Sequence, residues 1–225
     1  MFTKKIVTIH QPYFMPYLGF FDKMLHSTDF VILDDVQFEK NSFLNRNKIK
    51  TANGPIWLTI PTKGHLNQKI NQVMVDDSKN WRESHLKTIY FNYKKSKNFS
   101  KVYPKIEAIY HSNENNLAKF NFLTIKMLAK ELELKPNFYF SSDFNLKARG
   151  SELLLMITQK LNGKVYLSGQ MGKDYLDTKI FEKEKIEVQF QDYKSPQYDQ
   201  LWGEFVPNLS ALDYLFCDGL PLSKD

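Results

Sequence analysis

The sequence contains a single cysteine, Cys217, and this scarcity excludes several kinds of structure. One cysteine can form neither a disulfide within the chain nor a metal site built from several cysteines. Such cysteine usage fits a reducing cytoplasm. Because Cys217 follows the apolar pair Leu215 and Phe216, we expect a buried structural thiol and not a nucleophile.

Long hydrophobic runs are also missing. The apolar run at residues 6–9 follows two lysines but is too short for the core of a signal peptide. No run approaches the length of a membrane-spanning helix. The sequence also lacks helix-turn-helix, zinc-finger and RNA-binding signatures. We therefore expect a cytoplasmic protein with no membrane span and no nucleic-acid partner.

The residues that are present form an ordinary globular composition. The 225 residues are 42% hydrophobic and 25% charged, which is enough for a sizeable core. A net charge of +6 favours an anionic partner, such as a nucleotide or a phosphorylated substrate, without singling one out. Aromatic residues make up 15%, which suits either a cleft for planar or sugar-like ligands or an aromatic-rich core.

Short buried runs alternate with helix-forming stretches, which predicts one α/β domain with a Rossmann-like, mostly parallel central sheet and flanking helices. Strands are expected at residues 6–9, 30–33, 56–60, 71–75, 137–140, 165–167 and 186–190, the last at a sheet edge. Helices are expected at residues 19–26, 81–93, 116–134, 151–161 and 213–216, with Ser78 or Asn80 and Ser151 as caps. The helical stretch from about residue 78 to 135 is interpreted as an insertion or a helical layer.

The most informative stretch is residues 9–23, where an apolar strand ends in polar and turn-forming residues before a helix. Strand ends that lead into helices are where open α/β sheets bind ligands. His10 and Gln11 stand at this point, beside Pro12 and Pro16, which stiffen the turn. His10 suits an acid, a base or a phosphate-binding group, and the alternative is a structural turn with a satisfied histidine.

Three polar segments follow strands that we expect to be parallel neighbours, so their side chains would converge at one edge of the sheet. The segments carry His10 and Gln11; Asp34, Asp35 and Gln37; and Ser168, Gly169 and Lys173. Adjacent carboxylates in a continuing strand point to opposite faces, so one aspartate would face the cleft as a base or metal ligand while the other caps a loop. No second cluster at ligand spacing accompanies them, so we predict no metal site.

Three further segments could contact a ligand. Residues 43–50 are basic and rich in amides, so Arg46 could grip a phosphate or carboxylate, and a solvated positive loop is the alternative. Residues 168–173 combine two glycines, a hydroxyl and a lysine that could cradle an anion. This segment is not a Walker P-loop, because the spacing and the Lys-Ser/Thr pair are absent. Residues 191–198 fit a pocket wall or a plain surface loop equally well.

Taken together, these segments resemble the WbqC-like protein family. The motifs that carry the resemblance are HQPY, PYLGFFDK, DDVQF, NRNKIKT, WLTIP, YLSG, KDYL and FQDY, which begin at residues 10, 16, 34, 45, 57, 166, 173 and 190. They cover nearly the whole chain, with mild departures at Met15, where leucine is commoner, and at Phe43, where tryptophan is common. Members of the family tend to accompany enzymes of O-antigen, capsule or related glycan biosynthesis.

The resemblance implies a transferase that moves an acyl or aminoacyl group to the amine of a nucleotide-linked amino sugar. The catalytic acid–base group is then His10, Asp34 or Asp35. The residues expected to hold the substrate are Gln11, Tyr13, Gln37, Asn45, Arg46, Lys50, Ser168, Gly169 and Lys173. No cofactor is firmly implied, the donor being acyl-CoA or the phosphopantetheine of an acyl-carrier protein. The oligomeric state stays open.

A more distant similarity is to nucleotidylyltransferase-like proteins such as pantothenate synthetases. The order of strand, His/Pro-rich turn, helix and strand, followed by residues 35–38, looks like the start of those proteins. The chain lacks their HxGH pattern, since residues 16–20 contain no histidine, and this argues against adenylation. An ATP-using nucleotidyltransferase and a non-catalytic scaffold in a glycan-assembly complex stay open as alternatives.

Overall fold

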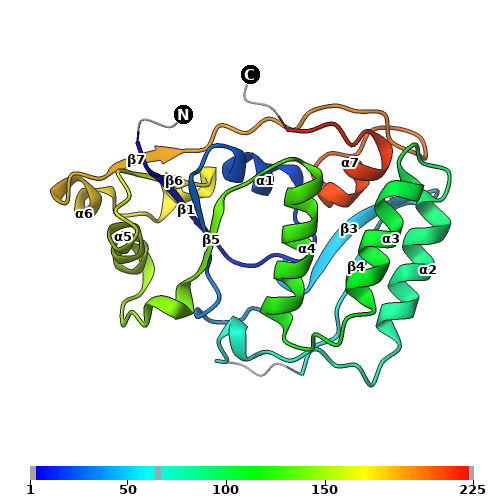
Figure 1. The fold of residues 1–225 in the computed structure, drawn as a ribbon, viewed down its shortest axis with the longest axis horizontal. Helices are drawn as coiled ribbons and strands as arrows, with labels where there is room; N and C mark the ends of the chain where they lie inside the picture. Colours follow the sequence, from blue (N-terminus) through cyan, green and yellow to red (C-terminus); the bar gives the residue numbers. More distant parts are fainter. Residues whose placement is uncertain (1–3, 64–66, 223–225) are drawn as a thin grey trace.

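The computed structural model describes residues 4–63 and 67–222, and its centre is a five-stranded parallel sheet (Figure 1). The strands are β1 (Ile6–His10), β2 (Asp29–Ile32), β5 (Asn137–Phe140), β6 (Val165–Ser168) and β7 (Glu187–Phe190). Their order across the sheet is β5-β2-β1-β6-β7, and every neighbouring pair is parallel. The chain therefore builds outward from β1 on one side and then returns to place β6 on its other side. This arrangement confirms the Rossmann-like α/β class.

The central strands are apolar on both faces because each face is covered by a separate hydrophobic cluster. In β2, Phe30 and Ile32 join one cluster, while Val31 joins the other. Helices α1 (Leu18–Leu25) and α4 (Leu117–Glu131) contribute to the first cluster, and α5 (Gly150–Lys160) and α6 (Thr178–Lys183) to the second. Continuous apolar runs are what a strand buried on both faces requires.

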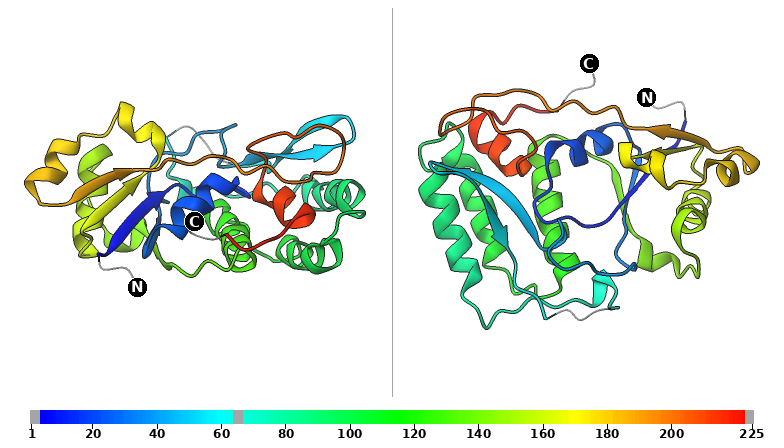
Figure 2. Two further views of the ribbon diagram at one scale, coloured as in Figure 1. Left: turned by 90° about the horizontal axis from the view of Figure 1, so that it is seen from above. Right: turned by 180° about the vertical axis from the view of Figure 1, so that it is seen from behind.

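A second layer is built by the chain between β2 and β5. It contains the antiparallel hairpin β3 (Arg46–Thr51) and β4 (Gly54–Thr59), the 3₁₀ turn η1 (Ile70–Gln72), and helices α2 (Trp81–Tyr93), α3 (Phe99–Tyr110) and α4. The last helix, α7 (Ala211–Cys217), contacts α3, α4 and β3. Figures 1 and 2 show the sheet at one end of the molecule and α2 and α3 at the other (Figure 1, Figure 2). Buried side chains of this layer share the cluster that contains Phe30.

Several local expectations are wrong. Residues 46–51 form strand β3, where a polar loop was one of the readings, because alternate residues Asn47 and Ile49 are buried. Residues 71–75 form no strand, since the chain makes a 3₁₀ turn that buries Ile70 and Val73 and is followed by isolated bridges. Ser151 does not cap α5: the helix begins at residue 150, and the Ser151 hydroxyl accepts a hydrogen bond from the backbone of residue 177. Helix α6 was not expected, and α3 was not predicted individually although it lies within the helical stretch expected at residues 78–135.

The start of α2 also departs from expectation. Asn80 occupies the N-cap position but makes no capping hydrogen bond, because its side-chain amide donates to Glu83 at 2.9 Å. The Ser78 hydroxyl donates to Asp76 instead. By contrast, Asn116 caps α4 by accepting from the backbone N–H of Lys119 at 3.1 Å.

The structure places Cys217 at the end of α7, where it is half-buried. Burial, with the nearby Asp213 carboxylate, raises the pKa of this thiol to about 12. A thiol with a raised pKa holds little of the nucleophilic thiolate at neutral pH, which agrees with a structural role. No helix within residues 4–63 and 67–222 is both long and apolar enough to cross a bilayer.

The buried imidazole of His85 makes the stability of the fold depend on pH. Its Nδ1 lies 3.0 Å from the hydroxyl of Tyr110, and burial lowers the pKa of the ring from 6.5 to about 4. Between these two values the unfolded chain binds more protons than the folded chain. The stability that the neutral ring contributes is therefore complete above pH 6.5 and is lost as the pH falls toward 4. Through this group we expect the free energy of unfolding to fall by about 2 kcal/mol from pH 7 to pH 5.

Urea denaturation at the two pH values measures this loss. The variant His85→Gln removes the titrating ring and should lose about 2 kcal/mol less than the wild type. His111 is exposed, so His111→Gln should follow the wild type and serves as the control. Equal losses in wild type and His85→Gln would contradict this account of the buried imidazole.

Candidate functional site

The strand order reverses between β1 and β6, and the carboxyl ends of these two strands mark the place where an open α/β sheet binds ligands. Strand β1 ends at His10 and β6 ends at Ser168. Val7 pairs with Tyr166, and the next residue of β1, Thr8, donates its hydroxyl to the carbonyl of Leu167 at 3.1 Å. The structure thus brings the first and third predicted segments together at this edge.

The ring of His10 is held in one tautomer by its surroundings. Its Nδ1 lies 2.9 Å from the backbone carbonyl oxygen of Gln11. A carbonyl can only accept, so Nδ1 carries the proton and Nε2 presents a lone pair. The ring also packs edge-on against Tyr13 and Phe20, with centroids 4.5 and 4.7 Å away. Nε2 has no hydrogen-bond partner among the described residues.

The protonation state of His10 suits a base. Burial, and then the positive charge of the nearby Lys23, lower the pKa of the ring well below its ordinary value. The imidazole is therefore neutral at neutral pH. A neutral imidazole with a bare Nε2 can accept a proton from a substrate, which is what a general base does.

Lys23 is a candidate site residue that the sequence analysis did not single out. It lies on α1, its side chain is almost entirely buried, and a Cβ built on Gly169 would stand 3.5 Å from its Nζ. Burial lowers the pKa of this amine to about 7, while Asp22 opposes the shift. The amine is therefore about half protonated near neutral pH, and a bound anion would raise its pKa. The sequence signal was its spacing from Gly19 and Phe20, four and three residues earlier, which puts the lysine on the buried face of the helix.

Gln191 was assigned only a possible wall position, and the structure gives it a more central place. It follows β7, is buried, and donates from Nε2 to the carbonyl of Gly19 at 2.8 Å and to Asp22 Oδ2 at 2.5 Å. The Gln191 amide is therefore hydrogen-bonded to the carboxylate of Asp22, the residue that precedes Lys23. No described carboxylate lies within ion-pair distance of Lys23.

Two buried amides fix the turn that follows His10. Asn121 of α4 donates to the carbonyl of Pro12 at 2.8 Å. Asn47 of β3 donates to the carbonyls of Phe14 at 3.2 Å and Met15 at 2.8 Å. Met15 has a φ of +42°, a left-handed conformation that is unusual for a residue other than glycine. These hydrogen bonds fix the backbone conformation of the turn. The turn then places Gln11 and Tyr13 beside the imidazole of His10.

The segment after β6 brings its backbone to the candidate site, whereas the charge of its lysine, Lys173, lies elsewhere. A Cβ at Gly172 would clash with the hydroxyl of the buried Ser168, so a larger residue there would require Ser168 to move. Lys173 is exposed and lies over the ring of Phe190, with Nζ 5.7 Å from the ring centroid. Phe190 ends β7, on the side of β6 away from β1. The lysine that approaches Gly169 is thus Lys23 and not Lys173.

The segment after β2 ties two strands together. Asp34 is buried and accepts hydrogen bonds from the backbone and hydroxyl of Ser142 at 3.0 and 2.9 Å. Both Asp34 and Asp35 accept from the hydroxyl of Ser141, which follows β5. The expectation that the two carboxylates point apart required the strand to continue through them, and it does not apply because β2 ends at residue 32. Gln37 is exposed. Within the described parts of the chain no three His, Cys, Asp or Glu side chains gather in a way that could hold a metal ion.

The predicted basic segment splits into structural and exposed residues. Asn45 is buried and hydrogen-bonds with backbone through both of its amide atoms. Lys50 is also buried, and its Nζ donates to Gln200 Oε1 at 3.0 Å and to two carbonyls of residues 203 and 204. These contacts hold the C-terminal segment against β3. Arg46 is only half-buried and stacks on Trp57, with Cζ 4.4 Å from the ring centroid.

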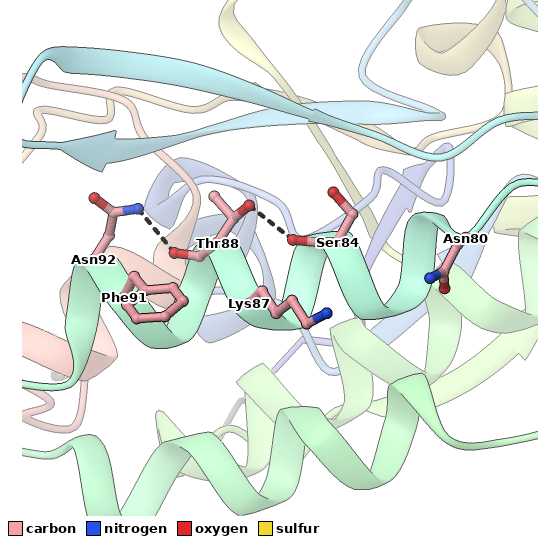
Figure 3. Close-up of a pocket in the computed structure, with 6 residues that line it drawn as sticks. All are labelled: Asn80, Ser84, Lys87, Thr88, Phe91 and Asn92. Atoms are coloured by element: carbon pink, nitrogen blue, oxygen red, sulfur yellow. Dashed lines mark hydrogen bonds between the residues drawn. The ribbon is translucent and has the colours of Figure 1, made fainter.

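An open hollow on α2 is a less suitable site (Figure 3). It is lined by Asn80, Ser84, Lys87, Thr88, Phe91 and Asn92. The Thr88 hydroxyl donates to the Ser84 carbonyl at 2.7 Å, and the Asn92 amide donates to the Thr88 carbonyl at 2.8 Å. Because these polar groups bond to their own helix, they do not converge on a ligand.

Comparison with known proteins identifies the family that the chain matches. The sequence model of the WbqC-like protein family matches residues 11–222. The chain is 32% identical over 216 residues to the "Uncharacterized protein Rv1507c" of Mycobacterium tuberculosis (strain ATCC 25618 / H37Rv), a match that covers 94% of this chain and 93% of that protein. No solved structure matches the chain, so the similarity to nucleotidylyltransferase-like proteins stays a prediction.

The buried amine of Lys23 predicts a distinct pH dependence of stability. Its folded pKa of about 7 lies below the ordinary value of 10.5, so the unfolded chain binds more protons between these values. Stability should therefore rise with pH from about 7 toward 10, by about 1 kcal/mol per pH unit through this group. The variant Lys23→Met keeps the length of the side chain and removes the charge, so it should lack this gradient.

Urea denaturation at pH 7, 8 and 9 tests the prediction by the difference between wild type and Lys23→Met. Lys173→Met removes an exposed lysine at the same sheet edge and should keep the wild-type gradient. A gradient that is the same in all three proteins would show that the Lys23 amine is not buried as described.

Proposed function

The chain belongs to the WbqC-like protein family, and from its site we propose that it transfers an acyl or aminoacyl group to the amine of a nucleotide-linked amino sugar. The observation that carries the proposal is the neutral imidazole of His10, with Nε2 bare, next to the buried amine of Lys23. Acyl transfer to an amine needs a base for the nucleophile and a positive group for the oxygen that becomes negative. The switch point of the sheet offers both.

His10 supplies the proton transfer in this proposal. The neutral amine of the sugar attacks the carbonyl carbon of the acyl donor, and Nε2 takes the N–H proton as the C–N bond forms. The imidazolium then returns that proton to the leaving sulfur or oxygen as the bond between the carbonyl carbon and the leaving group breaks. The products are an amide and a free thiol or alcohol, and His10 is neutral again. The hydrogen bond from Nδ1 to the carbonyl of Gln11 keeps Nε2 available throughout.

Lys23 supplies the charge. With a pKa of about 7 it is only partly protonated in the free protein, and a negative oxygen beside it favours the protonated form. The same positive charge lowers the pKa of His10, so a charged lysine keeps the histidine in its basic form. The nearness of Lys23 to Gly169 places this charge at the end of β6, where the backbone can come close to a substrate.

The composition and the family support the chemical class that we propose for the two substrates. A net charge of +6 favours phosphate-bearing substrates such as a nucleotide-linked sugar and acyl-CoA or an acyl phosphopantetheine. The tendency of WbqC-like proteins to accompany glycan-assembly enzymes supports a role in O-antigen or capsule biosynthesis. Asp34 and Asp35 take no part in the proposed step, because their hydrogen bonds join β2 to β5.

The direct test is an acyl-transfer assay on the purified protein. UDP-, GDP-, CMP- and dTDP-linked amino sugars are incubated with a panel of acyl-CoAs, and mass spectrometry detects the acylated sugar. With a productive pair, His10→Asn should lower the turnover number by about 10²- to 10⁴-fold, since it removes the base. His26 is an exposed histidine at the C-cap of α1, and His26→Asn should keep wild-type turnover.

Two outcomes would overturn the proposal. One is wild-type turnover in a folded His10→Asn variant. The other is release of pyrophosphate from ATP and Mg²⁺ without acyl transfer, which would instead indicate a nucleotidyltransferase.

A further inference from the structure

A second group of side chains lies on the outer face of the β3–β4 hairpin. We call it the Trp57 platform, and it consists of Phe43, Arg46, Lys48 and Trp57. The Arg46 Cζ is 4.4 Å and the Lys48 Nζ 4.9 Å from the centroid of the Trp57 ring. Lys48 pairs directly with Trp57 across the hairpin, and Arg46 is two residues away on the same face of β3. Trp57 is 41% and Phe43 45% exposed, which leaves both rings accessible.

The platform carries two positive charges without a counterion. No described carboxylate lies within ion-pair distance of Arg46 or Lys48. The Nε of Arg46 is buried and has no hydrogen-bond partner in the part of the chain that the structure describes. The indole face attracts both cations, but it does not cancel the repulsion between them. A bound anion would supply the missing counter-charge.

A row of aromatic rings joins the platform to the proposed catalytic edge. The ring of Phe43 is 6.1 Å from that of Trp57 and 5.6 Å from that of Tyr13. Tyr13 in turn lies 4.5 Å from His10. A single extended ligand could therefore contact His10 at one end and the cations at the other.

We propose that the Trp57 platform binds the nucleotide half of the substrate. Arg46 and Lys48 contact the diphosphate, which matches two adjacent cations that lack counterions. The base packs against the exposed rings of Trp57 and Phe43, since a stacked base needs an accessible aromatic surface. The sugar then extends along Tyr13 toward His10. The placement of the sugar rests on the proposed function, whereas binding of a free nucleoside diphosphate does not.

Calorimetric titration of the purified protein with UDP, GDP, dTDP and inorganic pyrophosphate tests this site without requiring turnover. At least one nucleoside diphosphate should bind more tightly than pyrophosphate. The double variant Arg46→Gln/Lys48→Gln should weaken its affinity by at least about 10-fold. Trp57→Ala should reduce the affinity for the nucleotide but not that for pyrophosphate, and Trp57→Phe should restore most of it because a ring remains.

The chain provides a matched control on α2. Lys94 also lies over aromatic rings, with Nζ 5.7 Å from the centroid of Tyr90 and 5.2 Å from that of Phe91. Lys94→Gln/Lys95→Gln removes the same charge from the protein and should leave nucleotide affinity at its wild-type value. Thermal melting of each variant shows that it is folded before its affinity is compared.

The results separate this inference from the proposed reaction. Nucleotide affinity that is unchanged in the folded Arg46/Lys48 variant, or no binding by any of the three nucleotides, would overturn the platform while leaving the test of His10 in place. If that variant loses nucleotide affinity while the α2 control keeps it, the result would support the platform even if no acyl transfer is found.

Discussion

The turn between β1 and α1 depends on two buried side-chain amides, and the candidate site depends on that turn. Asn121 and Asn47 reach it from α4 and β3, which are distant in the sequence, and hold three of its carbonyl oxygens. Carbonyls buried without donors would be costly, so these amides fix the backbone path as well as satisfy it. The hairpin and the helical layer are in this way parts of the site and not merely a covering for the sheet.

The fixed turn has a chemical consequence at its first residues. Because the carbonyl of Gln11 faces Nδ1 of His10, the imidazole carries its proton on the inner nitrogen. The buried amine of Lys23 lies close enough to lower the pKa of the same ring. Burial of the ring and the positive charge of Lys23 thus both disfavour the imidazolium form, so the histidine stays neutral. The site thus combines a neutral base with an amine that is only partly protonated near neutral pH.

Much of the fold could be predicted from the sequence, because it rests on local patterns. The continuous apolar runs before His10 and around Val31 predicted buried strands, and the polar residues after them predicted the edge of the sheet where the candidate site lies. Strand β3 was harder to predict, since its basic and amide residues are typical of a loop. Its alternation of Asn47 and Ile49 inward with Arg46 and Lys48 outward is clear only once the hairpin is formed.

The candidate site was less predictable, since its chemistry depends on contacts between distant segments. Helical spacing indicates that Lys23 faces the core, but it does not show that the buried amine, with its lowered pKa, lies near Gly169 at the end of β6. Asp34, Asp35 and Lys50 have the residue types of catalytic and phosphate-binding groups, yet their hydrogen bonds join strands and hold the C-terminal segment. Residue type alone could not distinguish these uses.

The most direct test of the account is the protonation state of His10, measured by nitrogen NMR of the imidazole from pH 6 to pH 8. The account predicts a neutral ring with the proton on Nδ1 over this whole range, and a higher pKa for the ring when Lys23 is replaced by methionine. A ring that is already charged at pH 6.5, or a proton found on Nε2, would contradict it.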